Sequence, residues 1–199
     1  MVKPENPACL RNQDPIFQAM SPWLKPQGHL LELACGTGQH GVYLASRLPH
    51  IQWHLSEHPS QIQLSQQWVC EAKLANLHKP IPLDVSDLLW SKELTHFNYG
   101  YCANLLHFVN EQSAKNVFNG FSQVLNTEGL LFCYGPINEH GFTSEGNQAL
   151  DNWLKQDINP LAGIKELDWL KQIAKGAGLI FLERLNLPAN NVILIFKKA

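Results

Sequence analysis

The chain has 199 residues, of which 45% are hydrophobic and 16% are charged, and its formal net charge is -2. This length suits one domain with a sizeable core, and the composition excludes an intrinsically disordered chain. Because there is no overall basic excess, a nucleic-acid partner is not favoured, although a local basic patch remains open. The five cysteines form no C-x-x-C pair, which argues against a zinc knuckle or a disulfide framework.

Membrane-directed segments are not expected in this sequence. No apolar run approaches the roughly 20 residues that a membrane-spanning helix needs. Residues 1–15 contain no apolar stretch of the kind that forms the centre of a signal peptide. We therefore expect a cytoplasmic protein without a membrane partner, and the sequence leaves its oligomeric state open.

Strand-like and helix-like patterns alternate along the chain. Short apolar runs and apolar–polar alternation predict strands, whereas apolar residues at helical spacing predict helices. In chain order, the predicted elements are a helix ending at Met20, a strand over 29–35, a helix over 38–48, a strand over 51–57, a helix over 59–74, strands over 80–85 and 97–104, a helix over 113–125, a strand over 129–136, a short helix near 147–156, a helix over 165–178, and strands over 179–187 and 191–198.

This alternation predicts a doubly wound α/β domain with helices on both faces of a mostly parallel sheet. Only residues 188–190 separate the last two predicted strands, which is too short for a crossover helix, so these strands must be antiparallel neighbours. The segment 137–163 is rich in Asn, Gly and Ser and interrupts the pattern. We expect residues 1–199 to form a single domain and 137–163 to be an insertion or lid near the acceptor site.

A glycine motif follows the first predicted strand, with Gly36, Gly38 and Gly41 in G-x-G-x-x-G spacing. Such a turn lets the backbone approach a ligand closely and places a helix N-terminus beside an anion. Glu57 ends the second strand and is suited to accept hydrogen bonds from ribose hydroxyls. Both features serve NAD and S-adenosylmethionine (SAM) equally, so they leave the ligand open.

Three further features favour SAM. Glu32 lies inside the first strand, where a buried carboxylate needs a polar partner, such as the ammonium group of SAM. Asp84 ends the third predicted strand and can accept a hydrogen bond from the adenine amino group. The chain also leaves little room for the separate substrate-binding structure that a dinucleotide enzyme normally carries. In the structural alternatives, Asp84 caps a turn and Glu32 is satisfied by a lysine or by backbone amides.

The stretch "LLELACGTGQHGVYLASRLP" (30–49) resembles motif I of class I SAM methyltransferases. More closely, the chain resembles a small, poorly characterised methyltransferase-like family with RNxDPI, SGTGQH and MPANN motifs. Here these motifs read "LRNQDPI" (10–16), "CGTGQH" (35–40) and "LPANN" (187–191). The resemblance implies the Rossmann-like class I fold, a seven-stranded sheet with one antiparallel strand. It also implies SAM as cofactor and S-adenosylhomocysteine (SAH) as product, but it names no acceptor.

The chain departs from the pattern of this family at several positions. Glu57 stands where Asp is usual, and Cys35 replaces a usual Ser. The family has W-G-x-R-D after Pro160, whereas this chain has "LAGIKE" (161–166), with Lys165 and Glu166 in place of Arg and Asp. Any acceptor contact carried over from that region is therefore in doubt.

Ligands of doubly wound sheets bind beyond the carboxyl ends of the strands, which selects the candidate site residues. The predicted cofactor-binding residues are Glu32, Ala34, Gly36, Gly38, Glu57, Asp84 and Asn104. His107 is the candidate general base, because the histidine pKa lies near neutrality, although a structural hydrogen bond is the alternative role. The predicted acceptor-pocket or lid residues are Arg11, Asn12, Tyr134 and Asn190, with Asn191 beside the last of these.

His50, His54 and His58 recur every four residues, but they fall along a predicted strand, where their side chains are spread apart, so we expect no metal site. The sequence thus predicts a SAM-dependent methyltransferase with a small-molecule acceptor. Two other functions remain open. One is an NAD(P)-dependent oxidoreductase, and the other is a SAM-binding or interaction protein without catalytic activity.

Overall fold

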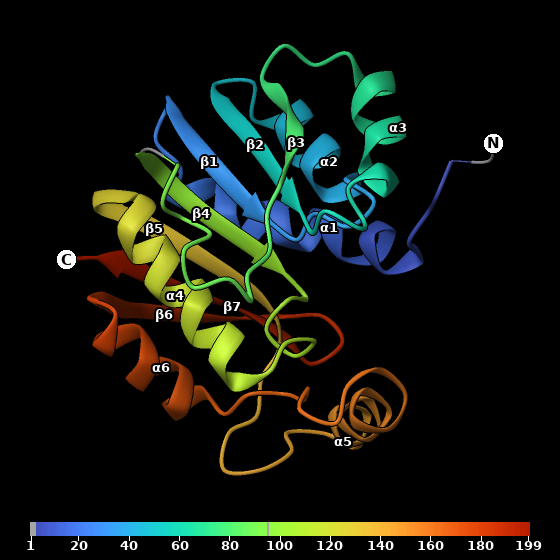
Figure 1. Cartoon of the computed structure of the whole chain (residues 1–199), viewed down its shortest axis with the longest axis vertical. Helices are drawn as coiled ribbons and strands as arrows, with labels where there is room; N and C mark the ends of the chain where they lie inside the picture. The colour runs from blue at the N-terminus through green and yellow to red at the C-terminus, as the bar shows by residue number, and fades with distance from the viewer. Residues whose placement is uncertain (1–2, 95) are drawn as a thin grey trace.

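A seven-stranded sheet forms the centre of the computed structural model, which describes residues 3–94 and 96–199 (Figure 1). The strand order is β3-β2-β1-β4-β5-β7-β6. Neighbouring strands are parallel except at β7, which is antiparallel to β5 and β6. The strands are β1 (Gly28–Leu33), β2 (Ile51–Glu57), β3 (Leu77–Pro82), β4 (Phe97–Ala103), β5 (Leu125–Pro136), β6 (Leu179–Leu187) and β7 (Asn191–Lys198). The predicted α/β, mostly parallel fold with an antiparallel C-terminal strand is confirmed.

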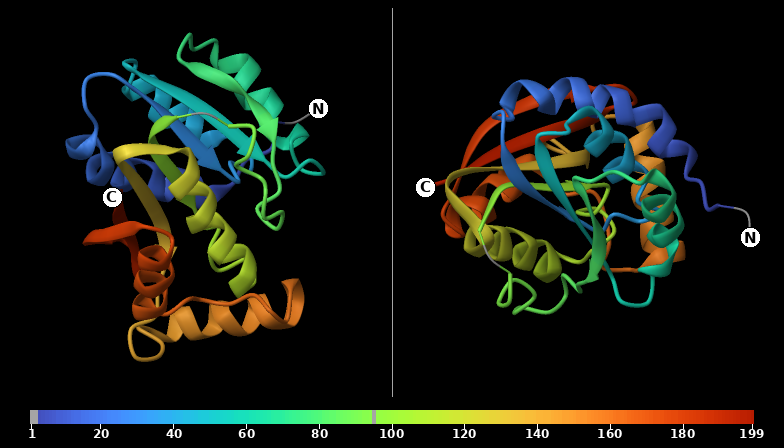
Figure 2. Two further views of the ribbon diagram at one scale, coloured as in Figure 1. Left: turned by 60° about the vertical axis from the view of Figure 1, so that its left-hand side comes forward. Right: turned by 90° about the horizontal axis from the view of Figure 1, so that it is seen from above.

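Helices cover both faces of this sheet, and Figure 2 shows α1 and α4 on opposite sides of it. The helices are α1 (Pro7–Met20), α2 (Gln39–Arg47), α3 (Gln63–Ala72), α4 (Glu111–Val124), α5 (Glu145–Trp153) and α6 (Leu167–Gly176). Among the residues that the structure describes, no helix is both long and apolar enough to cross a bilayer.

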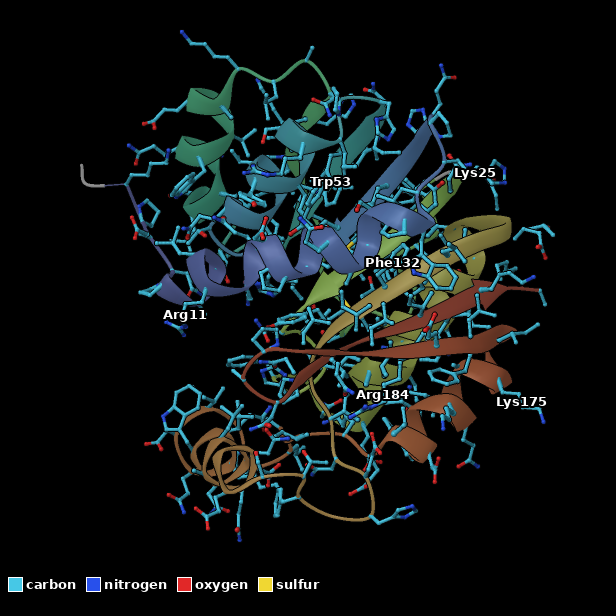
Figure 3. The ribbon with its side chains drawn as sticks, turned by 180° about the vertical axis from the view of Figure 1, so that it is seen from behind. Arg11, Lys25, Trp53, Phe132, Lys175 and Arg184 are labelled. Carbon is cyan, nitrogen blue, oxygen red and sulfur yellow. The ribbon has the colours of Figure 1, made fainter. Side chains whose placement is uncertain are left out.

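Each face of the sheet has its own hydrophobic core. Helices α1, α2 and α3 pack in one cluster with Trp53 and Phe132, and Figure 3 labels both side chains close to α1. Helices α4 and α6 pack in the other cluster with Phe196 of β7. These three aromatic side chains are fully buried, and each burial stabilises the fold by about 1.5–3 kcal/mol.

The third strand lies earlier in the chain than predicted. We predicted a strand over 80–85, but β3 begins at Leu77, which pairs with Trp53 of β2. β3 is an edge strand, and its His78 and Lys79 are exposed, so its first half lacks the apolar run that indicates a buried strand. Asp84 therefore follows the strand and does not end it.

Two predicted helices also have different bounds. Residues 59–62 form turns, so α3 begins at Gln63. Within the segment 137–163, the predicted helix over 147–156 is α5 followed by a π-helical turn, Leu154–Ile158. The left view of Figure 2 places α5 beyond one end of the sheet, next to the loops that follow β4 and β5.

Candidate functional site

The turn after β1 depends on a left-handed backbone at three positions. The φ angles are 54° at Ala34, 58° at Gly36 and 79° at Gly38. A Cβ on Gly36 would meet no atom within 4 Å, whereas a Cβ on Gly38 would lie 3.1 Å from Ser65 Cβ of α3. Glycine at these two positions thus avoids strain and leaves the turn open above Gly36.

Gly41, the third glycine of the motif, has a packing role. A Cβ at this position would lie 2.5 Å from Leu55 Cδ2 and 3.1 Å from the Glu32 carboxylate. Only a hydrogen atom fits there, and the close contact lets α2 lie directly on β1 and β2. Gly36 and Gly38 therefore allow the turn, and Gly41 allows the close packing of α2 on the sheet.

Glu32 is fully buried beneath α2. Trp53 Nε1 donates a hydrogen bond of 2.6 Å to Glu32 Oε2, so the partner is neither the lysine nor the backbone amide considered from the sequence. The pKa of Glu32 is raised to about 8, mainly by burial, with a smaller contribution from the nearby Glu57 and against the lowering effect of the Trp53 hydrogen bond. Nearby, the hydroxyl of Tyr101 is buried without a hydrogen-bond partner in the described chain. The carboxyl group of Glu32 therefore stays largely protonated at neutral pH.

Glu57 closes the other side of the glycine turn. Its carboxylate accepts hydrogen bonds from the backbone N–H of Gly36, at 2.5 Å, and of His58, at 2.8 Å. These two donors fix the carboxylate at the carboxyl end of β2 and hold it there as an acceptor. Its position beside the turn is the one expected for a group that binds ribose hydroxyls.

Asp84 and Asn104 lie at the same edge of the sheet. Asp84 Oδ1 accepts a hydrogen bond from the Ser86 backbone at 2.8 Å, which is the turn-capping contact considered from the sequence. Its other carboxylate oxygen lies 3.5 Å from His58 Nε2. Asn104 follows β4 in a left-handed conformation, with φ of 55°, and its backbone N–H donates to Tyr134 O. The two residues line different cavities: Asp84 lines one of about 320 Å³, and Asn104 lines one of about 480 Å³.

The cavity that Asn104 lines has a volume of about 480 Å³. Its walls are formed by α1, the loop after β4, the end of β5, α5 and the β6–β7 turn. Its volume suits a small molecule. The lining residues are Asn6, Ala8, Arg11, Asn12, Pro15, Asn104, His107, Phe108, Tyr134, Pro136, Leu150, Pro188, Ala189 and Asn191. Of the predicted acceptor residues, Arg11, Asn12 and Tyr134 line the cavity, but Asn190 does not, and Asn191 takes its place.

Several lining residues were not found by sequence reasoning. Phe108 and Leu150 are apolar side chains in ordinary contexts, and no local signal distinguishes them from core residues. Leu150 lies within the segment 137–163, so part of that segment borders the cavity.

Helix α1 is fixed over the glycine turn by side chains of α2. The Asn6 backbone N–H donates to Gln39 Oε1 at 2.6 Å, and His40 Nε2 lies 2.6 Å from Asn12 Oδ1. A third contact joins the Tyr43 hydroxyl to Asp14 of α1. The "QH" of the CGTGQH motif therefore positions α1, the helix that carries four of the cavity residues, a role that the sequence analysis did not assign to it.

His107 is buried at the wall of the cavity. The pKa of its imidazole is lowered to about 4, mainly by burial and in smaller part by the nearby positive charge of Lys165. The side chain is therefore uncharged at neutral pH. Lys165 itself donates to the carbonyls of Val109 and Gly163, and neither it nor Glu166 lines the cavity.

The histidines considered for a metal site are separate in space. His54 stacks on His78, with ring centroids 4.1 Å apart, and contacts His29 through a 3.0 Å ring-nitrogen contact. His58 instead lies beside Asp84, and His50 is exposed. Within residues 3–94 and 96–199, no group of three or more His, Cys, Asp or Glu side chains is placed to hold a metal ion.

The fold of this chain is similar to that of solved methyltransferases. An O-methyltransferase family protein from Burkholderia thailandensis matches with a TM-score of 0.82 and 14% identity, over 96% of this chain and 57% of the other. CalO1, a methyltransferase in calicheamicin biosynthesis solved with SAH bound, matches with a TM-score of 0.77 and 11% identity, over 96% and 55%.

A third similar structure is an O-methyltransferase family 2 protein from Planctomyces limnophilus in complex with apigenin, with a TM-score of 0.75 and 12% identity, over 94% of this chain and 62% of the other. The chain thus has a methyltransferase fold and spans little more than half the length of these proteins. A family model described as "Protein of unknown function (DUF938)" matches residues 3–198, and the chain belongs to this family.

Proposed function

We propose that this protein is a SAM-dependent methyltransferase that modifies a small-molecule acceptor. The observation that carries the proposal is the position of the glycine turn, Glu57 and Asn104 at the carboxyl ends of β1, β2 and β4, where Asn104 also lines the 480 Å³ cavity. Ligands of doubly wound sheets bind at these ends. The antiparallel β7 also favours this function over an NAD(P)-dependent oxidoreductase, whose sheet has the order 3-2-1-4-5-6.

The residues of the turn fit the chemistry of SAM. The first turn of α2 has N–H groups without helical partners, which suit the carboxylate of the methionine portion. Glu32 would pair with the ammonium group, because a cation beside a buried carboxyl group favours its ionised form. Glu57 would accept the ribose hydroxyls, and Asp84 would accept the adenine amino group.

When bound, SAM would supply an activated methyl group for transfer to the acceptor, with SAH as the other product. The protein contributes mainly by positioning. Tyr134, which lines the cavity, orients the acceptor. His107, uncharged at neutral pH, accepts a hydrogen bond or a proton from the acceptor at a ring nitrogen. Helices α1 and α5 wall the cavity and limit the access of water.

Incubation with methyl-labelled SAM and a small-molecule extract tests this proposal. Enzyme-dependent label in any small molecule supports it. Binding of SAM without transfer to any acceptor, whether a small molecule or a protein, would favour the non-catalytic SAM-binding protein. The Glu57→Gln variant should lose labelling, whereas Glu71→Gln, which changes an exposed carboxylate on α3, should not.

A further inference from the structure

The charge of the cavity points to a particular kind of acceptor. Arg11 is the one Lys, Arg, Asp or Glu side chain among the residues that line it. The other polar walls are formed by asparagines, Tyr134 and the uncharged His107. A cavity with one cation and no carboxylate attracts an anion and disfavours a cationic acceptor.

Arg11 has no internal partner to neutralise it. In the described part of the chain, its guanidinium forms neither an ion pair nor a hydrogen bond, whereas Arg184 pairs with Glu139 at 2.6 Å. The acidic residue one turn further along α1, Asp14, accepts a hydrogen bond from the Tyr43 hydroxyl and does not line the cavity. In Figure 3, Arg11 lies at the end of α1, on the side towards α5. Its charge is thus available to a ligand.

The residues around Arg11 suit a ligand that carries a planar anionic group and is otherwise largely apolar. Asn12 Oδ1 is engaged by His40, and the side chain of Asn12 also forms a hydrogen bond with Tyr134, so Asn12 holds two polar groups in place beside Arg11. Phe108, Leu150 and Pro136 line the same cavity and supply apolar contacts. A guanidinium fork matches a carboxylate in a bidentate manner, and a single arginine balances a single negative charge.

We infer that the acceptor is a small carboxylic acid, whose carboxylate is bound by Arg11 and whose apolar body lies against Phe108 and Leu150. This inference rests on the proposed methyltransferase function. The carboxylate acts as the recognition group, and the methyl group goes to a different atom of the acceptor, near His107. The proton of that atom passes to His107 or to solvent as the new bond forms.

The experiment uses matched pairs of probes with the SAH-loaded full chain. The acids are 4-hydroxybenzoate, salicylate and 4-hydroxycinnamate, and each has its carboxamide as neutral control. By calorimetry, at least one acid should bind about tenfold or more tightly than its amide. Arg11→Met should remove this preference, and Arg11→Lys should keep part of it. Arg47→Met, on α2 and outside the cavity, should change nothing.

Three results would overturn the inference: amides that bind as tightly as acids, an acid preference that survives in Arg11→Met, or no binding by any of the acids. Phenyl phosphate binding more tightly than the carboxylates would overturn the assignment of a carboxylate. SAH binding separates this inference from the proposed function. Wild type and Arg11→Met should bind SAH equally, and a wild-type protein that binds no SAH would refute the proposed function itself.

Discussion

Replacing Glu32 with Gln should stabilise the ligand-free protein at high pH and weaken its binding of SAM. Burial raises the pKa of Glu32 from 4.5 to about 8. At about 1.4 kcal/mol per tenfold change in proton affinity, this corresponds to about 5 kcal/mol. The folded chain keeps a proton that the unfolded chain loses between these pH values, so wild-type stability falls as pH rises through this window. Gln carries no such proton and keeps the shape of the side chain.

Urea unfolding of both proteins between pH 5.5 and pH 9 measures this effect. The advantage of Glu32→Gln over wild type should grow by about 3 kcal/mol across that range, because part of the full 5 kcal/mol is lost below pH 5.5. A difference between the two proteins that does not change with pH would refute the reasoning, since Glu32 would then be ionised in the folded state.

The same substitution separates stability from function. At pH 7, about nine-tenths of the Glu32 carboxyl groups carry a proton if the pKa is about 8. Pairing with the ammonium group of SAH would expel that proton, so calorimetry in buffers of different ionisation enthalpy should detect proton release by wild type. Glu32→Gln should bind SAH at least tenfold more weakly, with no such release. Proton uptake by wild type, or equal affinity of the two proteins, would contradict the assigned role of Glu32.

Three further predictions follow from the site. Gly41→Ala should reduce the free energy of unfolding by about 1–3 kcal/mol, because its Cβ would collide with Leu55. Urea titration measures this change, and unchanged stability would contradict the packing role of Gly41. Glu57→Gln should weaken SAH binding at least tenfold in calorimetry, with Glu71→Gln as the unaffected control; equal losses would remove the specific role of Glu57. The pKa of His107 lies near 4 in the folded protein, below the 6.5 of the unfolded chain, so the free energy of unfolding should fall by up to about 3 kcal/mol as pH drops from 6.5 to 4. In urea titrations, the His107→Asn variant should lose less stability over this pH range. An equal loss in variant and wild type would refute the lowered pKa of His107.

The sheet could be read from the sequence because local patterns and chain connectivity were sufficient. β2 alternates buried and partly exposed residues, and its predicted bounds, 51–57, agree with the structure. The short link at 188–190 required antiparallel β6 and β7, which the register confirms. The edge strand β3 was misplaced because its exposed polar residues give no apolar signal.

The site could be predicted only where the motif itself carries the chemistry. Glycines with positive φ and an acidic residue after the second strand depend on the local backbone, so the turn and Glu57 were within reach of sequence reasoning. The hydrogen bond of Trp53 to Glu32 joins two strands across the sheet and has no local signature. The cavity likewise depends on α1, which Gln39 and His40 hold in place across long sequence separations.

The central claim is that the glycine turn binds SAM and not a dinucleotide, and calorimetric titration of the full chain tests it most directly. The account predicts that SAH binds with one site per chain and that NADH and NADPH produce no binding heat. Binding of NADH or NADPH together with no binding of SAH would contradict it.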